Sequence, residues 1–505
     1  MAHLNLNNRM RHIASTIPII FLFCCFALFS GCDEFLDIEP HAVLNSDGYL
    51  TGEVQAEQFL TGAYDMLNKR YTSDKILFLA GDIKSDDAWN REDFGFKDYT
   101  HLPDNGQVQL AWENYYEAIK RCNRVVNDIA KMDQGQIDPD LRNRFVAEGK
   151  FLRAYFYFKM HQLWYNVPMI TEVLPANQKS SQVGQSSIET FWSQLETDLS
   201  DAIKGLPLKS EYENDDIGRV TKGAAYALKS MVHLYQEEWQ EAYQHANAVI
   251  QSNEYVLEDV FLEVFNLDHN SEVIFERQNM DGGLNFEGAY GDTWPDASEG
   301  TEYPVWARSI PFGGWQLRGV TRDLYDAFEP GDPRLHYPIA VPGDTIQGHV
   351  VGDDGYRTEG LYGPRKLYAE YTWERESLSH SRNSGSNWPI IRLGEIYLIR
   401  AESNIKLNKL DAAAADINQV RNRPDVSMPD VGPFTDQQDA MDAIIHERRI
   451  ELAMESVRFF DLVRWGIADD ELSELGFDKD QDEYLPIPQK EIDLSGGKLQ
   501  QNKGY

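Results

Sequence analysis

Two long segments, 111–131 and 141–164, carry apolar side chains at helical spacing, and this pattern limits the possible folds more than any other in the chain. Apolar and aromatic residues recur there at steps of three and four, which places them on one face of a helix. A third helix is expected over 187–205, with Ser186 or Ser187 as its N-cap. Such faces must be covered by other helices, so the sequence predicts a mostly α fold.

Shorter helical patterns continue this architecture along the chain. Helices are expected over 54–68, with Val54 on the apolar face, and over 436–456 and 458–466. Residues 72–108 are rich in Asp, Gly and aromatics, and they are expected to be irregular, as is a tail over 467–505.

Two segments resemble each other at an offset of 171 residues, which aligns Tyr226 with Tyr397 and Trp239 with Leu410. Each predicts a helix, a short polar turn and a second helix containing small residues. This pattern is typical of degenerate tetratricopeptide units, whose period is about 34 residues. The alternative is a pair of unrelated helical hairpins, since alanine-rich helices often match by chance.

A different region separates these two hairpins. Residues 255–389 contain Gly-Gly pairs, several prolines and five of the eleven tryptophans, and they lack a clear period. A structureless loop of this length is uncommon in a compact fold. We therefore expect a loop-rich lobe with short strands, inserted into a helical scaffold that spans about 51–254 and 390–466.

The N-terminus has the pattern of a lipoprotein precursor. The apolar run 17–29 is too short for a membrane span, which needs roughly 20 residues, but suits a signal peptide. Small residues precede Cys32, as in a bacterial lipobox, although Phe29 stands where Leu is usual. We expect removal of 1–31, a lipid on Cys32 and a tether over 32–50. An ordinary signal peptide cut elsewhere is the alternative.

The charge balance excludes some classes of partner. The chain has a formal net charge of −35 at pH 7. Nucleic acid binding needs Lys and Arg at the phosphates, and anionic lipid also attracts basic segments, so neither is an expected partner. Cys122 is the only cysteine after Cys32 and lies in an apolar helical pattern, which predicts a buried core residue.

Catalytic and metal-binding motifs do not match. His446-Glu447 lacks the second His of a zinc protease, and no phosphate-binding glycine loop or nucleophile elbow occurs. The acidic run from Asp478 begins like a calcium loop, but Glu483 and Gln489 stand at positions that require Gly and Glu. We read it as a solvated turn and assign no catalytic residue, metal ligand or cofactor.

Ten of the eleven tryptophans fall into two groups. Five lie on helical faces and are expected to be buried: Trp112, Trp164, Trp192, Trp239 and Trp465. Five lie in the lobe: Trp294, Trp306, Trp315, Trp373 and Trp388. Flat aromatic rings can stack on the C–H faces of sugars, so the lobe set suggests a ligand platform; simple core filling is the alternative.

Several motifs together resemble the RagB/SusD family of Bacteroidetes surface lipoproteins. They include "IIRLGEIYLIRAESNIKLNKLDAAAADINQVRNR", "IIHERRIELAMESVRFFDLVRWG", "YLPIPQKEID", "QNKGY", "FVAEGKFLRAYFYFKMHQLWYNVPMI", "DAFEPGDPR", and a lipidated Cys followed by "DEFLDIEP". These motifs run from residue 32 to residue 505. Within them, Arg448 and Glu451, and likewise Asp461 and Arg464, are spaced for pairing on a helix surface.

The resemblance implies a fold and a role. It implies a tetratricopeptide-like scaffold with an irregular ligand-binding lobe, without catalytic activity or cofactor. The lipoprotein is expected on the outer face of the outer membrane, as the lid of a SusC-like TonB-dependent transporter to which it delivers oligosaccharide. The family motifs are read as keeping the fold.

Ligand contacts in the family come from the loop after the first helix and from the lobe. By region, this points to Asp87, Trp89, Asn90, Trp294, Tyr303, Trp306, Arg308 and Trp315. An oligopeptide ligand, or glycoside hydrolysis by a pair of the many carboxylates, remains an alternative.

Overall fold

The computed structural model describes residues 49–90, 93–279, 318–341, 343–346, 349–350, 363–364, 366 and 387–505. The chain divides into two units, Met1–Thr51 and Gly52–Tyr505. The expected signal peptide 1–31 and Cys32 lie outside the described residues. Within the described part, no helix is both long and apolar enough to cross a bilayer.

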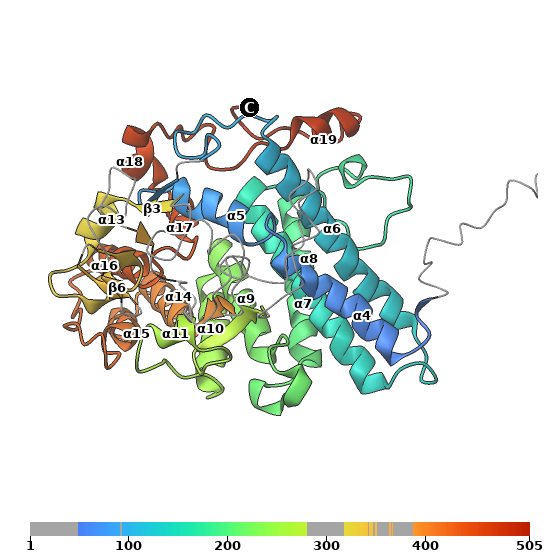
Figure 1. The fold of residues 1–505 in the computed structure, drawn as a ribbon, viewed down its shortest axis with the longest axis horizontal. Coiled ribbons are helices and arrows are strands. Elements are labelled where there is room, and N and C mark those ends of the chain that lie inside the picture. The colour runs from blue at the N-terminus through green and yellow to red at the C-terminus, as the bar shows by residue number, and fades with distance from the viewer. Residues whose placement is uncertain are drawn as a thin grey trace, which may run out of the picture. The chain divides into compact units, whose positions relative to one another are not determined.

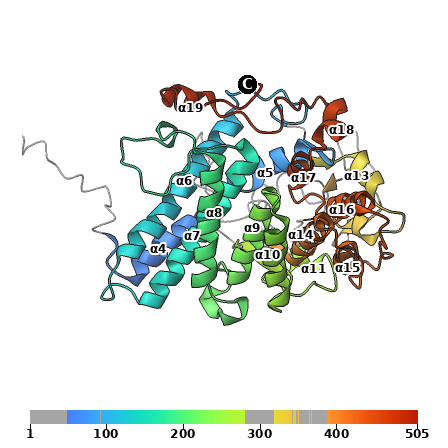
Figure 2. The ribbon, with the colours of Figure 1, turned by 180° about the vertical axis from the view of Figure 1, so that it is seen from behind.

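The second unit is built on packed helices, as the sequence predicted. The main ones are α4 (Glu53–Tyr64), α6 (Gly106–Asp128), α7 (Pro139–Trp164), α8 (Ile188–Gly205), α9 (Lys222–Tyr235), α10 (Trp239–Gln251), α14 (Leu393–Lys406), α15 (Leu410–Arg421) and α16 (Gln437–Glu451). From α6 to α10 each helix packs against the next, and α10 then packs against α14 (Figures 1 and 2). The lobe is therefore inserted between two neighbouring helices of the array.

Shorter elements complete the fold. They are η1 (Asp65–Asn68), α5 (Asp74–Phe78), η2 (Leu79–Ile83), η3 (Ile129–Lys131), η4 (Ser180–Gln182), η5 (Lys209–Glu211), η6 (Asn214–Asp216), α11 (Glu263–Asn266), α13 (Arg322–Ala327), η8 (Pro333–His336), α17 (Arg458–Trp465), α18 (Ala468–Leu472), η9 (Ser473–Leu475) and α19 (Gln489–Leu494). The strands are β1 (Ala88–Asn90), β2 (Val273–Arg277), β3 (Arg318–Val320), β4 (Ile339–Ala340), β5 (Thr345–Ile346), β6 (His349–Val350), β7 (Gly363–Pro364) and β8 (Trp388–Arg392).

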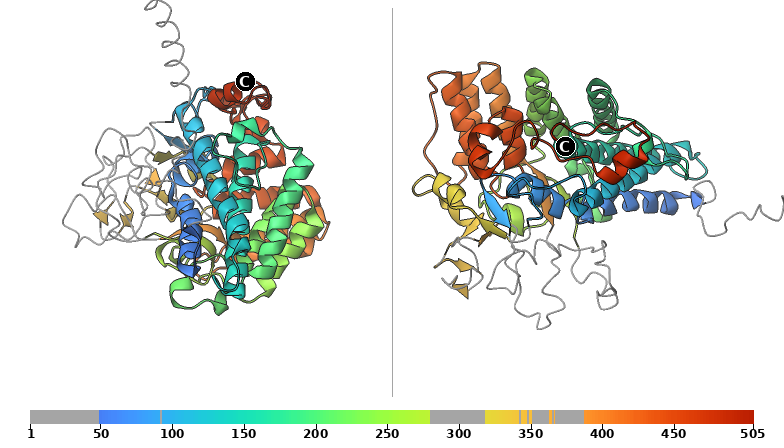
Figure 3. Two further views of the ribbon diagram at one scale, coloured as in Figure 1. Left: turned by 90° about the vertical axis from the view of Figure 1, so that its right-hand side faces the viewer. Right: turned by 90° about the horizontal axis from the view of Figure 1, so that it is seen from above.

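The strands form two-stranded antiparallel ladders, β1–β3, β2–β8, β4–β7 and β5–β6. The β2–β8 ladder pairs Arg277 with Trp388, so the strands entering and leaving the lobe lie side by side. The short strands expected in the lobe are thus present in its described part. Figure 3, right, shows α4 in blue and the lobe elements that follow residue 318 in yellow along one side of the unit, with green and orange helices opposite.

Side-chain caps explain where the long helices begin. Asn105 accepts hydrogen bonds from the amides of the first turn of α6, and Asp138 does the same for α7, which starts with Pro139. Ser187, one of the two predicted caps, accepts from the Thr190 amide over 3.1 Å. These caps satisfy amide groups that have no partner within the helix.

The two similar hairpins have the same turn. In the turn between α9 and α10, Glu237 has a φ of 57°, and in the turn between α14 and α15, Asn408 has a φ of 59°. The next amide donates to a carbonyl five residues earlier, over 2.9 Å in the first pair and 2.8 Å in the second. The residues of the two hairpins therefore correspond one to one, which supports the repeat interpretation over a chance match.

The core of the first half lies between α6 and α7. Trp112 and Trp164 meet edge to face there, 5.2 Å between ring centroids, and both are buried. Cys122 is buried as predicted, and burial raises the pKa of its thiol to about 12. Trp239 and Trp465, also predicted to be buried, are half-buried beneath Lys406 and Arg464 respectively.

The expectation of an irregular segment over 72–108 was wrong for residues 74–83. There α5 runs directly into the π-helical turn η2. A Cβ at Gly81 would lie 2.2 Å from the carbonyl oxygen of Ser456, and Asp82 accepts hydrogen bonds from the amide and hydroxyl of Ser456. A contact with a residue some 370 positions later holds this turn, so local sequence could not reveal it.

Val54, the C-terminal tail and the acidic turn at Asp478 also differ from the expectations. Val54 is 63 % exposed, because α4 turns its first residues away from the core. The tail contains α18 and α19 and is not wholly irregular. The acidic turn is only partly solvated: Asp482 is buried, accepting from the Asp478 amide, and its carbonyl oxygen accepts from the Lys84 ammonium over 2.7 Å.

Candidate ligand-binding site

Trp89 lies on β1, where the lobe meets the scaffold. It pairs with Gly319 of β3, and its side chain is half-buried. A Cβ on Gly319 would lie 2.1 Å from Nε1 of Trp89, so the indole crosses the neighbouring strand at a place that only glycine leaves open. The tertiary structure therefore fixes the position of the predicted aromatic contact.

Asp87, another predicted contact, is buried and paired. Its Oδ1 lies 2.8 Å from Nε of Arg449, while Arg458 binds both carboxylate oxygens of Asp86 at 2.9 Å. Burial raises the pKa of Asp87; for Asp86, hydrogen bonds and charge from Arg458 outweigh burial and lower the pKa. Asp87 thus anchors β1 to α16, and direct contact with ligand stays a prediction.

Of the remaining predicted contacts, only Asn90 lies within the described residues. Asn90 is buried at the end of β1. The five predicted lobe residues lie outside the described residues: Trp294, Tyr303, Trp306, Arg308 and Trp315. Their role in binding stays a prediction.

A pocket of about 420 Å³ lies beside the start of the lobe. Its walls are the end of α4 with η1, the loop 215–219, and the end of β2 as far as Asn279. Ligand pockets commonly have volumes of about 300–1,000 Å³. Asn279, the last described residue before the predicted lobe aromatics, lines this pocket, and the next described residues form β3, whose Gly319 lies against Trp89.

The pocket combines apolar surface with hydrogen-bonding groups. Ile217 on its rim is 50 % exposed. The Oδ1 atom of Asn68 is buried and has no hydrogen-bond partner among the described residues. Arg277 lies with its guanidinium over the ring of Trp388, 5.5 Å from the centroid, so that face of Trp388 is already covered. No local sequence pattern indicates this pocket, because its walls come from three separate segments of the chain.

Two residues of the pocket wall, Tyr64 and Arg219, contact a buried carboxylate. Glu148 of α7 is fully buried; it accepts from the Tyr64 hydroxyl over 2.6 Å and lies 3.5 Å from Nη1 of Arg219. Arg219 also pairs with Asp216 at 2.7 Å. Burial raises the pKa of Glu148 to about 7, against the lowering effect of Arg219 and Tyr64. The protonation of Glu148 is therefore poised near neutral pH.

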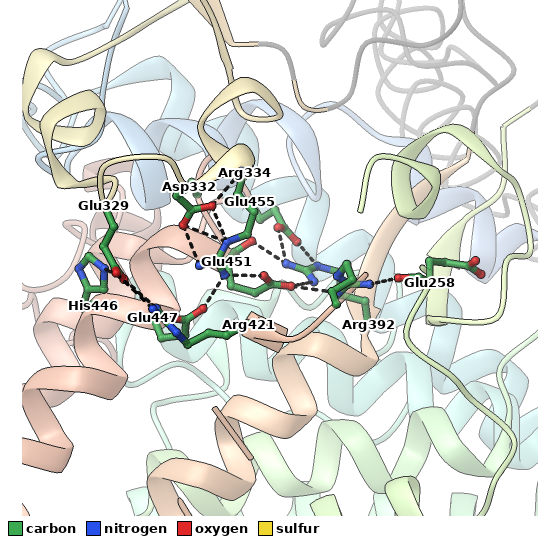
Figure 4. A network of polar contacts seen from close by, with 12 residues as sticks. Glu258, Glu329, Asp332, Arg334, Arg392, Arg421, His446, Glu447, Glu451 and Glu455 are labelled. Carbon is green, nitrogen blue, oxygen red and sulfur yellow. Dashed lines mark hydrogen bonds and ion pairs between the residues drawn. The ribbon is translucent and has the colours of Figure 1, made fainter. Parts of the chain in front are cut away.

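A second charged network joins the lobe to the scaffold (Figure 4). Its centre is Glu451, the last residue of α16, which binds Arg392 at 2.7 Å, Arg334 at 3.2 Å and Arg423 at 3.4 Å. Burial alone would raise the pKa of Glu451, but the three guanidinium groups hold it at about 2. Arg334 belongs to the lobe, so this network fixes the lobe to α16.

The network shows that charged residues of the family motifs pair in the interior of the protein. Arg334 comes from "DAFEPGDPR", whereas Glu447 and Glu451 come from "IIHERRIELAMES", and these motifs meet in the interior. The expected pair of Arg448 with Glu451 was wrong, because Arg448 binds Asp461 at 2.8 Å instead. The expected pair of Asp461 with Arg464 is present at 2.8 Å, but it is buried and not on the surface.

Two family models match the chain. The model described as "SusD family" matches residues 271–483, and the model described as "Starch-binding associating with outer membrane" matches residues 34–234. The two matches do not overlap, and each extends over one half of the helical array.

Individual relatives agree with these models. A SusD-like protein of Formosa agariphila is 26% identical, over 96% of this chain and 99% of the relative. The solved structure of a laminarin-binding SusD-like protein is 29% identical, covers 90% of this chain and 100% of its own, and superposes with a TM-score of 0.75. A SusD homologue from Bacteroides thetaiotaomicron shares the fold at a TM-score of 0.77 with 20% identity. With both halves matched and the helical-pair fold shared, the chain belongs to the RagB/SusD family.

Proposed function

We propose that this protein captures oligosaccharide at the cell surface and delivers it to a SusC-like TonB-dependent transporter. In this proposal it is anchored in the outer membrane by a lipid on Cys32, faces the cell exterior and serves as the transporter's lid. It binds the glycan without cleaving it and needs no cofactor.

The observation that carries the proposal is the likeness to the laminarin-binding SusD-like protein, at 29% identity across 90% of this chain. The matching family model described as starch-binding and outer-membrane-associated supports the same ligand class and location. Laminarin is therefore the first polysaccharide to test.

The site geometry suits a sugar. A pyranose ring presents C–H faces that pack on an indole or an aliphatic side chain, and hydroxyls that need hydrogen-bond partners. Trp89 and Ile217 offer the first kind of surface, and the side-chain amide of Asn68 lies in the pocket wall as a hydrogen-bonding group. We infer that the glycan lies along the lobe between the pocket and β1.

Titration calorimetry of the purified chain without its signal segment tests ligand class. The panel is laminarin, starch and a mixture of oligopeptides. We expect saturable binding of a polysaccharide and no release of reducing sugar after long incubation. Binding of peptides alone would overturn the glycan proposal, and release of reducing sugar would overturn the non-catalytic part of it.

The transporter requires a separate experiment. Affinity purification through a tag on this protein, from the native outer membrane, should recover a large TonB-dependent barrel in stoichiometric amount. Recovery of the lipoprotein alone from a membrane that contains the barrel would contradict the delivery role, whatever the outcome of the glycan assay.

A further inference from the structure

Three side chains outside the pocket wall bring potential metal ligands together. Glu196 lies on α8, His233 in the last turn of α9, and Glu238 at the start of α10, three helices that pack side by side (Figure 2). Their ligand atoms all lie within 4.8 Å of one another. Within the described part of the chain, no other group of three or more His, Cys, Asp or Glu side chains meets this criterion.

The imidazole is held in place. His233 is 5 % exposed, and its Nδ1 lies 2.6 Å from Oε2 of Glu238. The ring of His245, from α10, stacks on it with 5.2 Å between centroids and an angle of 15°. Restricting the ring in this way reduces the entropy that His233 would lose on binding an ion.

The carboxylates are also oriented. The left-handed conformation of Glu237 and the bond from the Glu238 amide to the His233 carbonyl, 2.9 Å, turn Glu238 back toward the ring. The side-chain Nε2 of Gln236 donates to Oε1 of Glu196 over 3.0 Å, which leaves the other oxygen of that carboxylate for a ligand. The cluster thus has the supporting contacts that metal sites need around their ligands.

The fold does not require these residue types. In the second hairpin, which has the same turn, Asn404 and Lys409 occupy the positions of His233 and Glu238. The ligand set is therefore not a condition for forming the turn. It is a particular feature of the first hairpin.

The donor set indicates the kind of ion. One imidazole nitrogen and two carboxylate oxygens form a mixed set of ligand types that Zn²⁺ accepts, with water as the fourth ligand, whereas Ca²⁺ and Mg²⁺ prefer oxygen alone. Lys229 is the lysine of α9 nearest to His233 in sequence. Its Nζ donates to the Ser200 hydroxyl over 2.8 Å. The two carboxylates carry a negative charge that a divalent cation balances.

We propose that Glu196, His233 and Glu238 bind one Zn²⁺ ion, or a divalent transition ion of similar preference. The ion would link α8 to the α9–α10 hairpin and so stabilise the middle of the helical array. This site lies on different elements from the glycan pocket, and it does not depend on the proposed function.

The test uses the untagged chain without its signal segment, freed of metal by a chelator. Zn²⁺ is titrated by calorimetry, and bound metal is measured by elemental analysis after gel filtration. We expect one tight site. Glu196→Gln should weaken Zn²⁺ binding at least tenfold while leaving the bond between His233 and Glu238 intact, and His233→Gln should abolish the tight site.

His269→Gln is the matched control. Nδ1 of His269 also lies 2.6 Å from a glutamate oxygen, that of Glu276, but among the described residues no third potential ligand joins this pair. This variant should bind Zn²⁺ as the wild type does. Co²⁺ in place of Zn²⁺ should give the visible absorption of a tetrahedral centre, lost in Glu196→Gln.

Thermal unfolding provides a second readout, because an ion that binds only the folded state raises Tm. Zn²⁺ should raise the Tm of the wild type and of His269→Gln but not of His233→Gln. Equal Zn²⁺ affinity in the wild type, Glu196→Gln and His233→Gln would overturn the proposal, as would the absence of any tight site in the wild type.

Discussion

Nη1 of Arg392 donates to Oε1 of Glu451 over 2.7 Å, and the two side chains are 2 % and 0 % exposed. Arg392 ends β8, the strand that leaves the lobe, and Glu451 ends α16 of the scaffold. One buried ion pair therefore joins the exit of the ligand-binding lobe to the last helices of the array. Removing a charge from this interior should be costly, and the first prediction tests this.

Glu451→Gln should destabilise the protein strongly. The change leaves Arg392, Arg334 and Arg423 around an uncharged amide, and breaking a buried ion pair typically costs about 3–5 kcal/mol. Urea unfolding followed by circular dichroism measures the free energy of unfolding. The matched control is Glu113→Gln, whose partner Lys490 is largely exposed and which should cost less than about 1 kcal/mol. Equal effects of the two changes would contradict the structural role of the network.

Gly319→Ala should weaken glycan binding as much as Trp89→Ala does. The added methyl group would lie 2.1 Å from the indole nitrogen of Trp89 and must displace the ring from β3. If the indole stacks on sugar, we expect a loss of about tenfold or more in affinity, or roughly 1.4 kcal/mol. Calorimetry with the polysaccharide that binds the wild type measures it. Gly106→Ala, where nothing lies within 4 Å of the new Cβ, is the control and should bind normally.

Asn68→Ala should lower glycan affinity without unfolding the protein. Its side-chain oxygen has no partner among the described residues, so truncation removes no internal hydrogen bond accepted by that atom, but it would remove a side-chain amide from the pocket wall. We expect a loss of about 0.5–1.5 kcal/mol in binding free energy. Unchanged affinity together with weakened binding in Trp89→Ala would place the glycan at β1 and outside the pocket.

Glu148 should make stability depend on pH. Its pKa rises from 4.5 to about 7 on folding, so between these values the folded state binds more protons than the unfolded state. The stabilising contribution is full below about pH 4.5 and is lost as pH rises through about 7. Glu148→Gln removes this group's titration. The stability of the wild type relative to this variant should therefore fall from pH 5 to pH 8, by roughly 1–3 kcal/mol.

Urea unfolding of both proteins at the two pH values checks this prediction, because the difference between them cancels the other titrating groups. A difference that stays constant, or that grows with pH, would show that Arg219 and Arg144 keep Glu148 ionised throughout this range.

The helical array was predictable because its signals are local. Periodic apolar residues over 111–131 and 141–164, caps such as Ser187, and the paired hairpins at Tyr226 and Tyr397 each depend on neighbours within a few turns. The family motifs were equally readable in the sequence. Their meaning was not, since Arg448 and Glu451 are three residues apart yet bind different partners in the interior.

Local patterns were thus enough to predict the mostly helical class, the insertion of a lobe between two hairpins and the family. The three-dimensional fold was needed to show which charged residues are buried, why 74–83 is helical, where the pocket lies and that Glu196 meets His233. The reason is physical. Helix formation depends on side chains three or four positions apart, whereas desolvation and ion pairing depend on residues brought together from distant parts of the chain.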